Sequence, residues 1–330
     1  MGGDFAPQAT VSGALLALAE LDPAHSIQLV GPTATIKGEL DRQAGEHRDL
    51  AKQCARVEII EAPDVIAMSD KPGAAIRGKP NSSMVVGLKL QAAGKSDAFV
   101  SAGNTGAQMA ASVVVLRLHA GLKRPAIATV FPTAKQPIVV LDSGANVDCA
   151  PAELVQFAQL GAIYAEDVLG RPNPVIGLLN IGEEPEKGNA AAKEAHQLLL
   201  ASGLNFIGNV EGRDLPRGSC DHGAFDVVVC DGFVGNVVLK FYEAVAPFII
   251  GTLKEAGVDE RQLGSALGHL DYSQYGGAPL LGVNGISIIS HGKSSPKALK
   301  NALKVAVRAV ESRMDEHIGR RLEPKSEATA

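Results

Sequence analysis

The chain has 330 residues, of which 46% are hydrophobic, and a chain of that size buries enough surface to fold without covalent or metal cross-links. Its net charge of −5, without a block of Lys and Arg, excludes the basic stripe typical of nucleic-acid-binding proteins. The four cysteines form no CxxC pair, and the eight histidines never lie at the spacing of a helical zinc pair. We therefore predict reduced thiols, no metal, no cofactor and no nucleic-acid partner.

Apolar, β-branched runs alternate with stretches of helical periodicity along the chain. Strands are predicted at Ser26–Val30, Val57–Ile60, Ala98–Ser101, Ile127–Phe131, Ile138–Asp142, Val175–Leu179, Phe206–Asn209, Val227–Asp231 and Ile286–Ser290. Helices are predicted at Val11–Glu20, Met84–Ala93, Thr105–Leu118, Ala152–Leu169, Ala190–Ser202 and Pro296–Arg313. This alternation predicts an α/β fold with parallel strand pairs and helices on both faces of the sheet.

The predicted organisation is one elaborated α/β domain over residues 1–320, followed by a disordered tail over residues 321–330. Two lobes with a cleft between them are the alternative. No secretory signal segment opens the chain, and no uninterrupted apolar run approaches the ~18 residues of a membrane span. The expected location is the cytoplasm, with peripheral contact to a membrane left open.

Two turns share one design at the ends of predicted strands. Phe99–Ala107 (FVSAGNTGA) and Val228–Asn236 (VVCDGFVGN) each run from a strand through two glycines into a helix. Such glycines let the backbone approach a ligand, and the start of the following helix favours an anion. Neither turn is a P-loop, and no GxGxxG occurs in the chain. Glycines that only permit close packing are the alternative, which the repetition of the design makes weaker.

Two further segments carry polar residues next to predicted strands. Leu179–Asn189 places Lys187 among acidic residues before a helix, where it adds a positive charge for a phosphate or is simply part of a solvated helix start. Asp271–Gly285 is too rich in glycine for regular structure and too apolar for an ordinary loop. It leads through a strand to His291, for which we keep acid–base, anion-binding and structural roles open.

Taken together, these segments resemble the bacterial acyl-acyl-carrier-protein:phosphate acyltransferases. The resemblance rests on SAGNTGA (Ser101–Ala107), NIGEE with KGN (Asn180–Asn189), CDGFVGNVVLK (Cys230–Lys240), YGGAPLLGVNG (Tyr275–Gly285) and SHG (Ser290–Gly292). Weaker matches are MGGDFAP (Met1–Pro7), SSMVVGLKL (Ser82–Leu90), KRPAIATVFPT (Lys123–Thr133) and LDSGANVDCAP (Leu141–Pro151). These strings cover nearly the whole chain in order.

The resemblance implies a three-layer αβα sandwich like that of the isocitrate and isopropylmalate dehydrogenases and of phosphate acetyltransferase. It implies a homodimer that converts acyl carrier protein thioesters and inorganic phosphate into acyl phosphates, which pass to a membrane glycerol-phosphate acyltransferase. Two departures stand out. Family members carry a short strand ahead of the MGGD string, without which the sheet would lose a member, and the stretch from Leu239 to Asp271 is short for the family.

The reaction needs no activated serine or cysteine, because phosphate is already an anionic nucleophile. We predict that Asn104 or Asn236 donates to the developing oxyanion, that Lys187 holds phosphate, and that Asp231 orients Asn236 or Lys187 instead of acting as a base. Substrate binding is predicted for the glycines and polar residues of the matching strings: Gly2, Gly3, Asp4, Gly103, Thr105, Gly106, Glu183, Asn189, Gly232, Gly235, Gly276, Gly277 and His291.

Alternatives remain for one apolar segment and for the function. Phe241–Leu253 lines an acyl-chain groove, rests on lipid, or packs in an interface or core, and Pro247 argues against one unbroken helix there. A coenzyme A-dependent phosphate acyltransferase or a nicotinamide-dependent dehydrogenase on a related fold is the first rival function. A membrane-associated scaffold with vestigial turns is the second.

Overall fold

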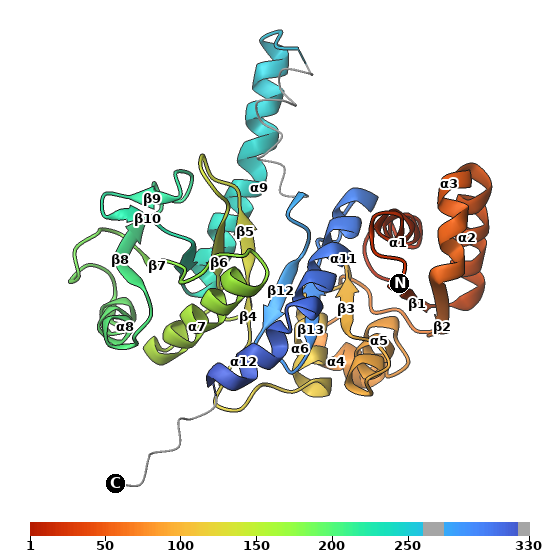
Figure 1. Ribbon diagram of the computed structural model, residues 1–330, viewed down its shortest axis with the longest axis horizontal. Coiled ribbons are helices and arrows are strands. Elements are labelled where there is room, and N and C mark those ends of the chain that lie inside the picture. The colour runs from red at the N-terminus through yellow and green to blue at the C-terminus, as the bar shows by residue number, and fades with distance from the viewer. Residues whose placement is uncertain (260–273, 323–330) are drawn as a thin grey trace. The chain divides into compact units, whose positions relative to one another are not determined.

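A computed structural model describes residues 1–259 and 274–322 (Figure 1). The chain divides into two compact units, one formed by Met1–Ala120 with Ser273–Ala330 and the other by Gly121–Tyr272. A cleft between two lobes stays a prediction. The tail predicted from residue 321 does not begin there, because the last helix, α12, runs over Met314–Leu322. Residues 323–330 lie outside the described residues.

The unit formed by Gly121–Tyr272, called the second unit, contains a five-stranded sheet in the order β5-β6-β11-β7-β8. Its elements are β4 (Ala126–Ile127), β5 (Thr129–Phe131), β6 (Ile138–Leu141), α7 (Pro151–Asp167), β7 (Ile176–Asn180), α8 (Ala190–Ala201), β8 (Phe206–Glu211), β9 (Ser219–Cys220), β10 (Gly223–Ala224), β11 (Val227–Val229) and α9 (Gly232–Glu255). Strands β6, β11, β7 and β8 pair in parallel, which confirms that prediction for them, whereas β5 is antiparallel to β6. The carboxyl ends of four strands therefore share one edge.

Helices cover both faces of this sheet, as predicted. Gly161 of α7 packs so closely that an added Cβ would lie 2.7 Å from side-chain atoms of both Leu141 and Val227. Val140, which has the opposite pleat, belongs to a core cluster against which Val238 of α9 packs. The β-branched and leucine side chains of the strands are consequently buried on both sides, which explains their continuous apolar sequence.

The other unit, called the first unit, contains two sheets and most of the remaining helices. Its elements are α1 (Gln8–Glu20), β1 (Ile27–Gly31), α2 (Thr33–Glu46), α3 (Arg48–Ala51), η1 (Lys52–Arg56), β2 (Val57–Glu61), α4 (Pro72–Gly78), α5 (Ser83–Ala92), β3 (Ala98–Ser101), α6 (Thr105–Val115), β12 (Ala278–Leu281), β13 (Ile286–Ile289), α11 (Pro296–Glu311) and α12. β1 pairs in parallel with β2. β13 pairs in parallel with β3 and antiparallel with β12.

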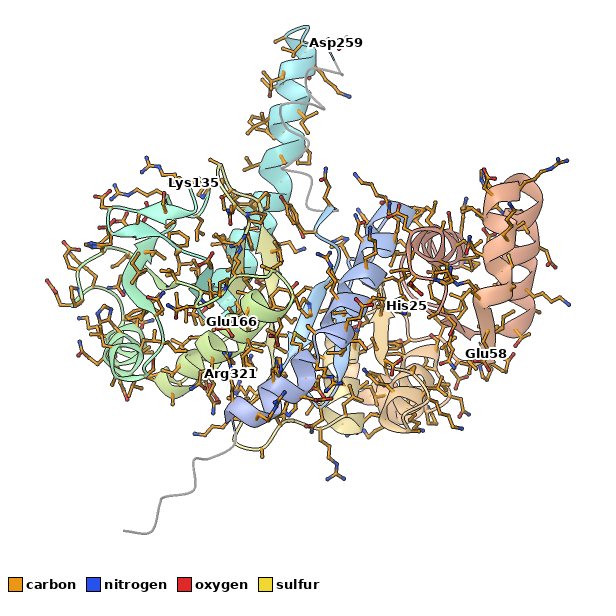
Figure 2. All side chains as sticks on the ribbon, in the orientation of Figure 1. His25, Glu58, Lys135, Glu166, Asp259 and Arg321 are labelled. Carbon is orange, nitrogen blue, oxygen red and sulfur yellow. The ribbon has the colours of Figure 1, made fainter. Side chains whose placement is uncertain are left out.

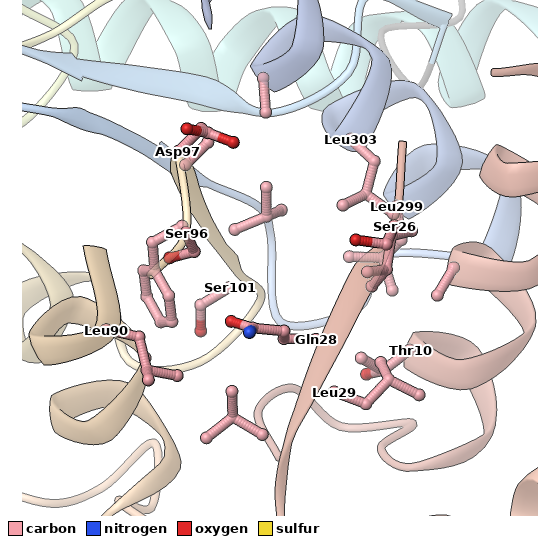
Figure 3. Close-up of a pocket in the computed structure, with 18 of the residues that line it drawn as sticks. Thr10, Ser26, Gln28, Leu29, Leu90, Ser96, Asp97, Ser101, Leu299 and Leu303 are labelled. Carbon is pink, nitrogen blue, oxygen red and sulfur yellow. The ribbon is translucent and has the colours of Figure 1, made fainter. Parts of the chain in front are cut away.

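A cavity of about 350 Å³ lies between β1 and β3, which do not pair with each other (Figure 3). Gln28, Ser101 and Asp97 supply polar groups to its wall, and Leu29 and Leu299 supply apolar ones.

Two local predictions are wrong. The glycine-rich segment before residue 286 contains a regular strand, β12. Its composition does not favour a strand, but antiparallel pairing with β13 stabilises one. Helix α9 continues through Pro247, although proline cannot donate to the carbonyl four residues earlier. Only Gly232 and Gly235 of α9 are buried, so water can satisfy the carbonyl that Pro247 leaves unpaired.

The outer part of α9 extends beyond the sheet of its own unit, toward Asp259 (Figure 2). Its most apolar 18-residue stretch has a mean hydropathy of 1.5 with only 6% buried, and it is the one such helix in the described ranges. Length and mean hydropathy alone would let α9 cross a membrane, but Lys240 and Glu243 interrupt its apolar run, in agreement with the prediction that the chain has no uninterrupted apolar run of that length. The rest of the stretch predicted to be short for the family, from residue 260, lies outside the described residues.

Candidate active site

The turn after β11 places unpaired donors at the carboxyl edge of the second unit's sheet. Asp231 is the N-cap of α9, and its Oδ1 accepts a hydrogen bond from the Val234 N–H at 2.8 Å. The Gly232 N–H donates to the Asn146 carbonyl at 2.7 Å. The Phe233 N–H and the exposed side-chain amide of Asn236 make no hydrogen bond with the described residues. These two groups are therefore available to a ligand at the helix start.

Asp142, which follows β6, builds the wall beside this helix start. Its carboxylate is fully buried and accepts five hydrogen bonds: from the N–H groups of Ile127, Gly144, Ala145 and Asn146, and from the Asn146 side chain. Burial raises the pKa of Asp142, whereas these donors favour the ionised form and lower it. The carboxylate thereby shapes a tight loop whose Gly144 lies against Asn236, 3.4 Å from a Cβ placed on the glycine.

Asp142→Asn is expected to destabilise the second unit by about 2 kcal/mol. The amide nitrogen of the new side chain would face N–H groups instead of accepting from them, which leaves buried donors unpaired. Chemical denaturation followed by circular dichroism measures the change. Asp148→Asn is the control, because the exposed Asp148 side chain makes no hydrogen bond with the described residues; equal stability of the two variants would contradict the role of Asp142.

The loop that carries Lys187 starts at the end of β7, the strand next to β11, so it lies at the same edge. Lys187 is exposed, and its Nζ lies 3.9 Å from the nearest oxygen of Glu184, too far for a strong ion pair. Glu183 lies 3.6 Å from the His222 ring. Asn189 caps α8, where its Oδ1 accepts from the Ala192 N–H at 2.8 Å.

In the first unit, Asn104 follows β3 and is occupied by structural hydrogen bonds. It caps α6 through a bond from the Ala107 N–H to Oδ1, and its Nδ2 lies 3.0 Å from the carbonyl oxygens of Met68 and Asp70. Gly106 lets the start of α6 lie close to Pro72, because an added Cβ would lie 2.8 Å from that proline. The side chain of Asn104 thus binds a neighbouring loop, and its predicted oxyanion role stays a prediction.

The MGGD string lies between the ends of the parallel strands β3 and β13. A Cβ on Gly2 would lie 3.0 Å from the backbone of Gly103, and the Asp4 N–H donates to the Gly292 carbonyl at 2.8 Å. His291, next to this contact, is exposed, and its Nδ1 accepts from the Lys293 N–H at 3.1 Å, which leaves the proton of the neutral ring on Nε2. Asp4, Thr105 and His291 are thus exposed at one edge of the first unit.

Gly276 and Gly277 pack against protein instead of facing an open site. Both have positive φ, 66° and 36°. A Cβ on Gly276 would overlap the backbone of Asn301 in α11, and one on Gly277 would overlap Ile288 in β13. Close approach of backbones explains both glycines, and their substrate-binding role stays a prediction.

Comparison with known proteins identifies the family of this chain. Residues 1–317 match the family described as "Fatty acid synthesis protein". Phosphate acyltransferases of Desulforamulus reducens and Clostridium botulinum are 49% and 43% identical, over 94% and 96% of this chain and 92% and 94% of their own lengths. The chain belongs to the phosphate acyltransferase family.

Solved structures similar to this phosphate acyltransferase show the fold alone. A branched-chain phosphotransacylase of Enterococcus faecalis aligns with a TM-score of 0.59 over 94% of this chain and 96% of its own, at 15% identity. The phosphotransacetylase EutD of Staphylococcus aureus aligns with a TM-score of 0.54 over 91% and 99%, at 14% identity. The α/β architecture predicted from the sequence is confirmed at this level.

The thiols of this phosphate acyltransferase do not offer a nucleophile beside the helix start. All four cysteines are unpaired. Burial raises the pKa of Cys149 to about 12 and that of Cys230 well above its ordinary value. Both thiols next to the Gly232 turn are therefore protonated at neutral pH. Within residues 1–259 and 274–322, no three His, Cys, Asp or Glu residues gather as metal ligands would.

Sequence reasoning gave no role to Asp142, Asn146 or Asn209. Asp142 and Asn146 lie in the LDSGANVDCAP string that supported the family resemblance, but no function was predicted for the residues of that string. Asn209 lies inside a predicted strand and carries no motif. Asn236, Lys187 and Asp231 are brought to one edge of the second unit, as adjacent strand ends require.

Proposed function

We propose that this phosphate acyltransferase moves a fatty acyl group from acyl carrier protein to inorganic phosphate and so supplies acyl phosphate for phospholipid synthesis. One observation carries the assignment of the site: Asn236 and the Lys187 loop extend from the ends of adjacent parallel strands. No described residue bonds to the amide of Asn236, and the nearest carboxylate oxygen to the Lys187 ammonium is 3.9 Å away, on Glu184. The family membership supports phosphate as the acceptor.

The reaction requires positioning and charge stabilisation more than covalent catalysis. A phosphate oxygen attacks the thioester carbonyl carbon, which forms a tetrahedral oxyanion. The carbon–sulfur bond then breaks, the acyl phosphate is released, and the thiolate of the pantetheine arm takes a proton from water. The protonated state of Cys149 and Cys230 fits this scheme, in which phosphate itself is the nucleophile.

Each exposed group at the edge has a role in this proposal. The amide of Asn236 and the Phe233 N–H donate to the oxyanion at the positive end of the α9 dipole. Asp231 caps the helix and does not act as a base, since its Oδ1 accepts the Val234 N–H. Its negative charge opposes an anion nearby, so Lys187 supplies the attraction for phosphate.

Thr105 and His291 of the first unit also have roles in this proposal. His291, whose Nδ1 accepts from the Lys293 N–H, presents an Nε2–H donor, and Thr105 presents a hydroxyl beside the start of α6. Asn104 positions this turn and is not itself the oxyanion donor, because its amide is engaged with residues 67–70. We assign to both groups a contact with the acyl donor.

The finer predictions extend the same proposal. They are the isocitrate-dehydrogenase-like version of the αβα fold, the cytoplasmic location, the homodimer and the peripheral association with a membrane. An apolar surface on α9 is consistent with peripheral contact to a membrane. It is formed by the exposed side chains of Phe233, Val237, Phe241 and Phe248. The product would then pass to a membrane glycerol-phosphate acyltransferase.

A comparison of acyl donors tests the proposal. Palmitoyl-acyl carrier protein or palmitoyl-coenzyme A is supplied with phosphate, and acyl phosphate is measured as the hydroxamate that hydroxylamine forms only when phosphate is present, because hydroxylamine also attacks thioesters. We expect a kcat/KM at least about tenfold higher with acyl carrier protein, the equivalent of 1.4 kcal/mol of transition-state binding. Preference for coenzyme A would assign the chain to the rival transferases, and no acyl phosphate with either donor would contradict an acyltransferase function.

A further inference from the structure

The Lys187 loop (residues 181–188) is fixed at its base by Asn180, the last residue of β7. Asn180 Oδ1 accepts from the Ile181 N–H at 2.9 Å, and Asn180 Nδ2 donates to the Lys187 carbonyl at 3.1 Å. The following Gly188 has a φ of 95° and lies against the Asn180 side chain. Both ends of the loop are therefore held by one amide.

A second connection reaches the middle of the same loop from the core of the second unit. Asn209, in β8, is 1% exposed, and its Nδ2 donates to the Glu184 carbonyl at 2.8 Å. That carbonyl also accepts from the backbone N–H of Lys187 at 3.1 Å. One carbonyl oxygen thus links Asn209 directly to the residue that carries the ammonium group.

His196 of α8 completes this connection and fixes its direction. The ring is 3% exposed, packs edge-on against Phe206 at 5.2 Å, and places Nδ1 3.0 Å from Asn209 Oδ1. Because the Glu184 carbonyl only accepts, the amide nitrogen of Asn209 must face it. The amide oxygen then faces His196, which must donate from Nδ1.

A buried polar pair is costly unless its hydrogen bonds are made, and apolar residues would fill this part of the core without that requirement. The hydrogen bonds of this pair run from His196 in the core through Asn209 to one acceptor in the loop, the Glu184 carbonyl. We propose that Asn209 and His196 are positioning residues that hold the Lys187 ammonium at the phosphate acceptor. This inference rests on the proposed function, in which Lys187 binds phosphate.

Asn209→Asp tests the connection with almost no change of shape. The carboxylate still accepts from His196 but cannot donate to the Glu184 carbonyl. We expect the KM for phosphate to rise about tenfold and kcat to change little, because the loss is one of ground-state and transition-state binding alike. Trypsin cleavage after Lys187 should also become faster. Asn205→Asp is the matched control, since the exposed Asn205 makes the same kind of bond, to the Asn173 carbonyl at 3.0 Å.

Variants of His196 separate positioning from general stability. His196→Asn keeps an N–H near the place of Nδ1 and should restore most of the affinity for phosphate that His196→Leu loses. If Asn209→Asp unfolds at the assay temperature, this pair provides the same measurement. Equal KM values for phosphate in His196→Leu and His196→Asn would overturn the proposal.

Lys187→Ala separates the phosphate-binding role of Lys187 from the positioning role of Asn209 and His196. Suppose that Lys187→Ala is impaired but that Asn209→Asp has the same kinetics as Asn205→Asp. This result would overturn the positioning role of Asn209 and would still support the proposed phosphate site. A normal KM for phosphate in Lys187→Ala would contradict the phosphate role of Lys187 itself, and with it the purpose that we assign to Asn209. Lys193→Ala, an exposed lysine on α8, controls for loss of surface charge.

Discussion

Asn236→Ala is expected to lower the turnover of acyl phosphate formation by about 10²–10³-fold, the usual effect of removing one oxyanion donor. The substitution takes away the side-chain amide of the fifth residue of α9, near the helix start, where charge develops in the proposed reaction. Stability should stay within about 0.5 kcal/mol, because the exposed amide has no partner among the described residues. The measurement is kcat at saturating phosphate and acyl-acyl carrier protein, with thermal unfolding in parallel.

Val237→Ala is the control for this experiment. The neighbouring Val237 is 53% exposed, so its truncation tests whether any change at the helix start lowers turnover. We expect its kcat to match that of the unaltered enzyme. If Asn236→Ala turned over as fast as Val237→Ala, Asn236 would lose its oxyanion role, and the Phe233 N–H would remain as the donor to be tested.

Most strands could be predicted because their signal is local. Ala98–Ser101 is a short apolar run bounded by polar and glycine residues, and β3 has those same bounds. β12 could not be recognised in this way, because glycines precede it and Pro279 lies within it. Its regularity comes from pairing with β13, for example Pro279 opposite Ile288, and such tertiary pairing leaves no mark on local composition.

The candidate site could be predicted in kind but not in detail. Glycine turns at strand ends indicated an anion site, and the strand order brings the Val228–Asn236 turn and the Lys187 loop to one edge of the second unit. Whether an asparagine is available depends on distant partners: residues 67–70 occupy Asn104, while no described residue bonds to Asn236. Asp142 was not recognised because its donors include Ile127, 15 residues earlier.

Gly235→Ala is expected to destabilise the second unit by about 3 kcal/mol or more, at the upper end of overpacking effects. Gly235 is buried on the first turn of α9, and an added Cβ would overlap the carbonyl oxygen of Asp142 and lie 3.0 Å from Cys230 Sγ. Neither group can move freely, since Cys230 follows a central strand and the Asp142 carboxylate organises the loop after β6. Urea unfolding measures the loss of free energy.

Gly251→Ala, in the same helix, provides the opposite expectation. Apart from the helix's own backbone, no atom of the described residues lies within 4 Å of an added Cβ there, so alanine should stabilise the helix by about 0.5–1 kcal/mol through its better helix propensity. The two variants carry the same chemical change, and only the approach of α9 to Asp142 distinguishes them. If Gly235→Ala were as stable as Gly251→Ala, the start of α9 would not be held against this loop. Asn236 would then have no fixed place from which to donate to an oxyanion.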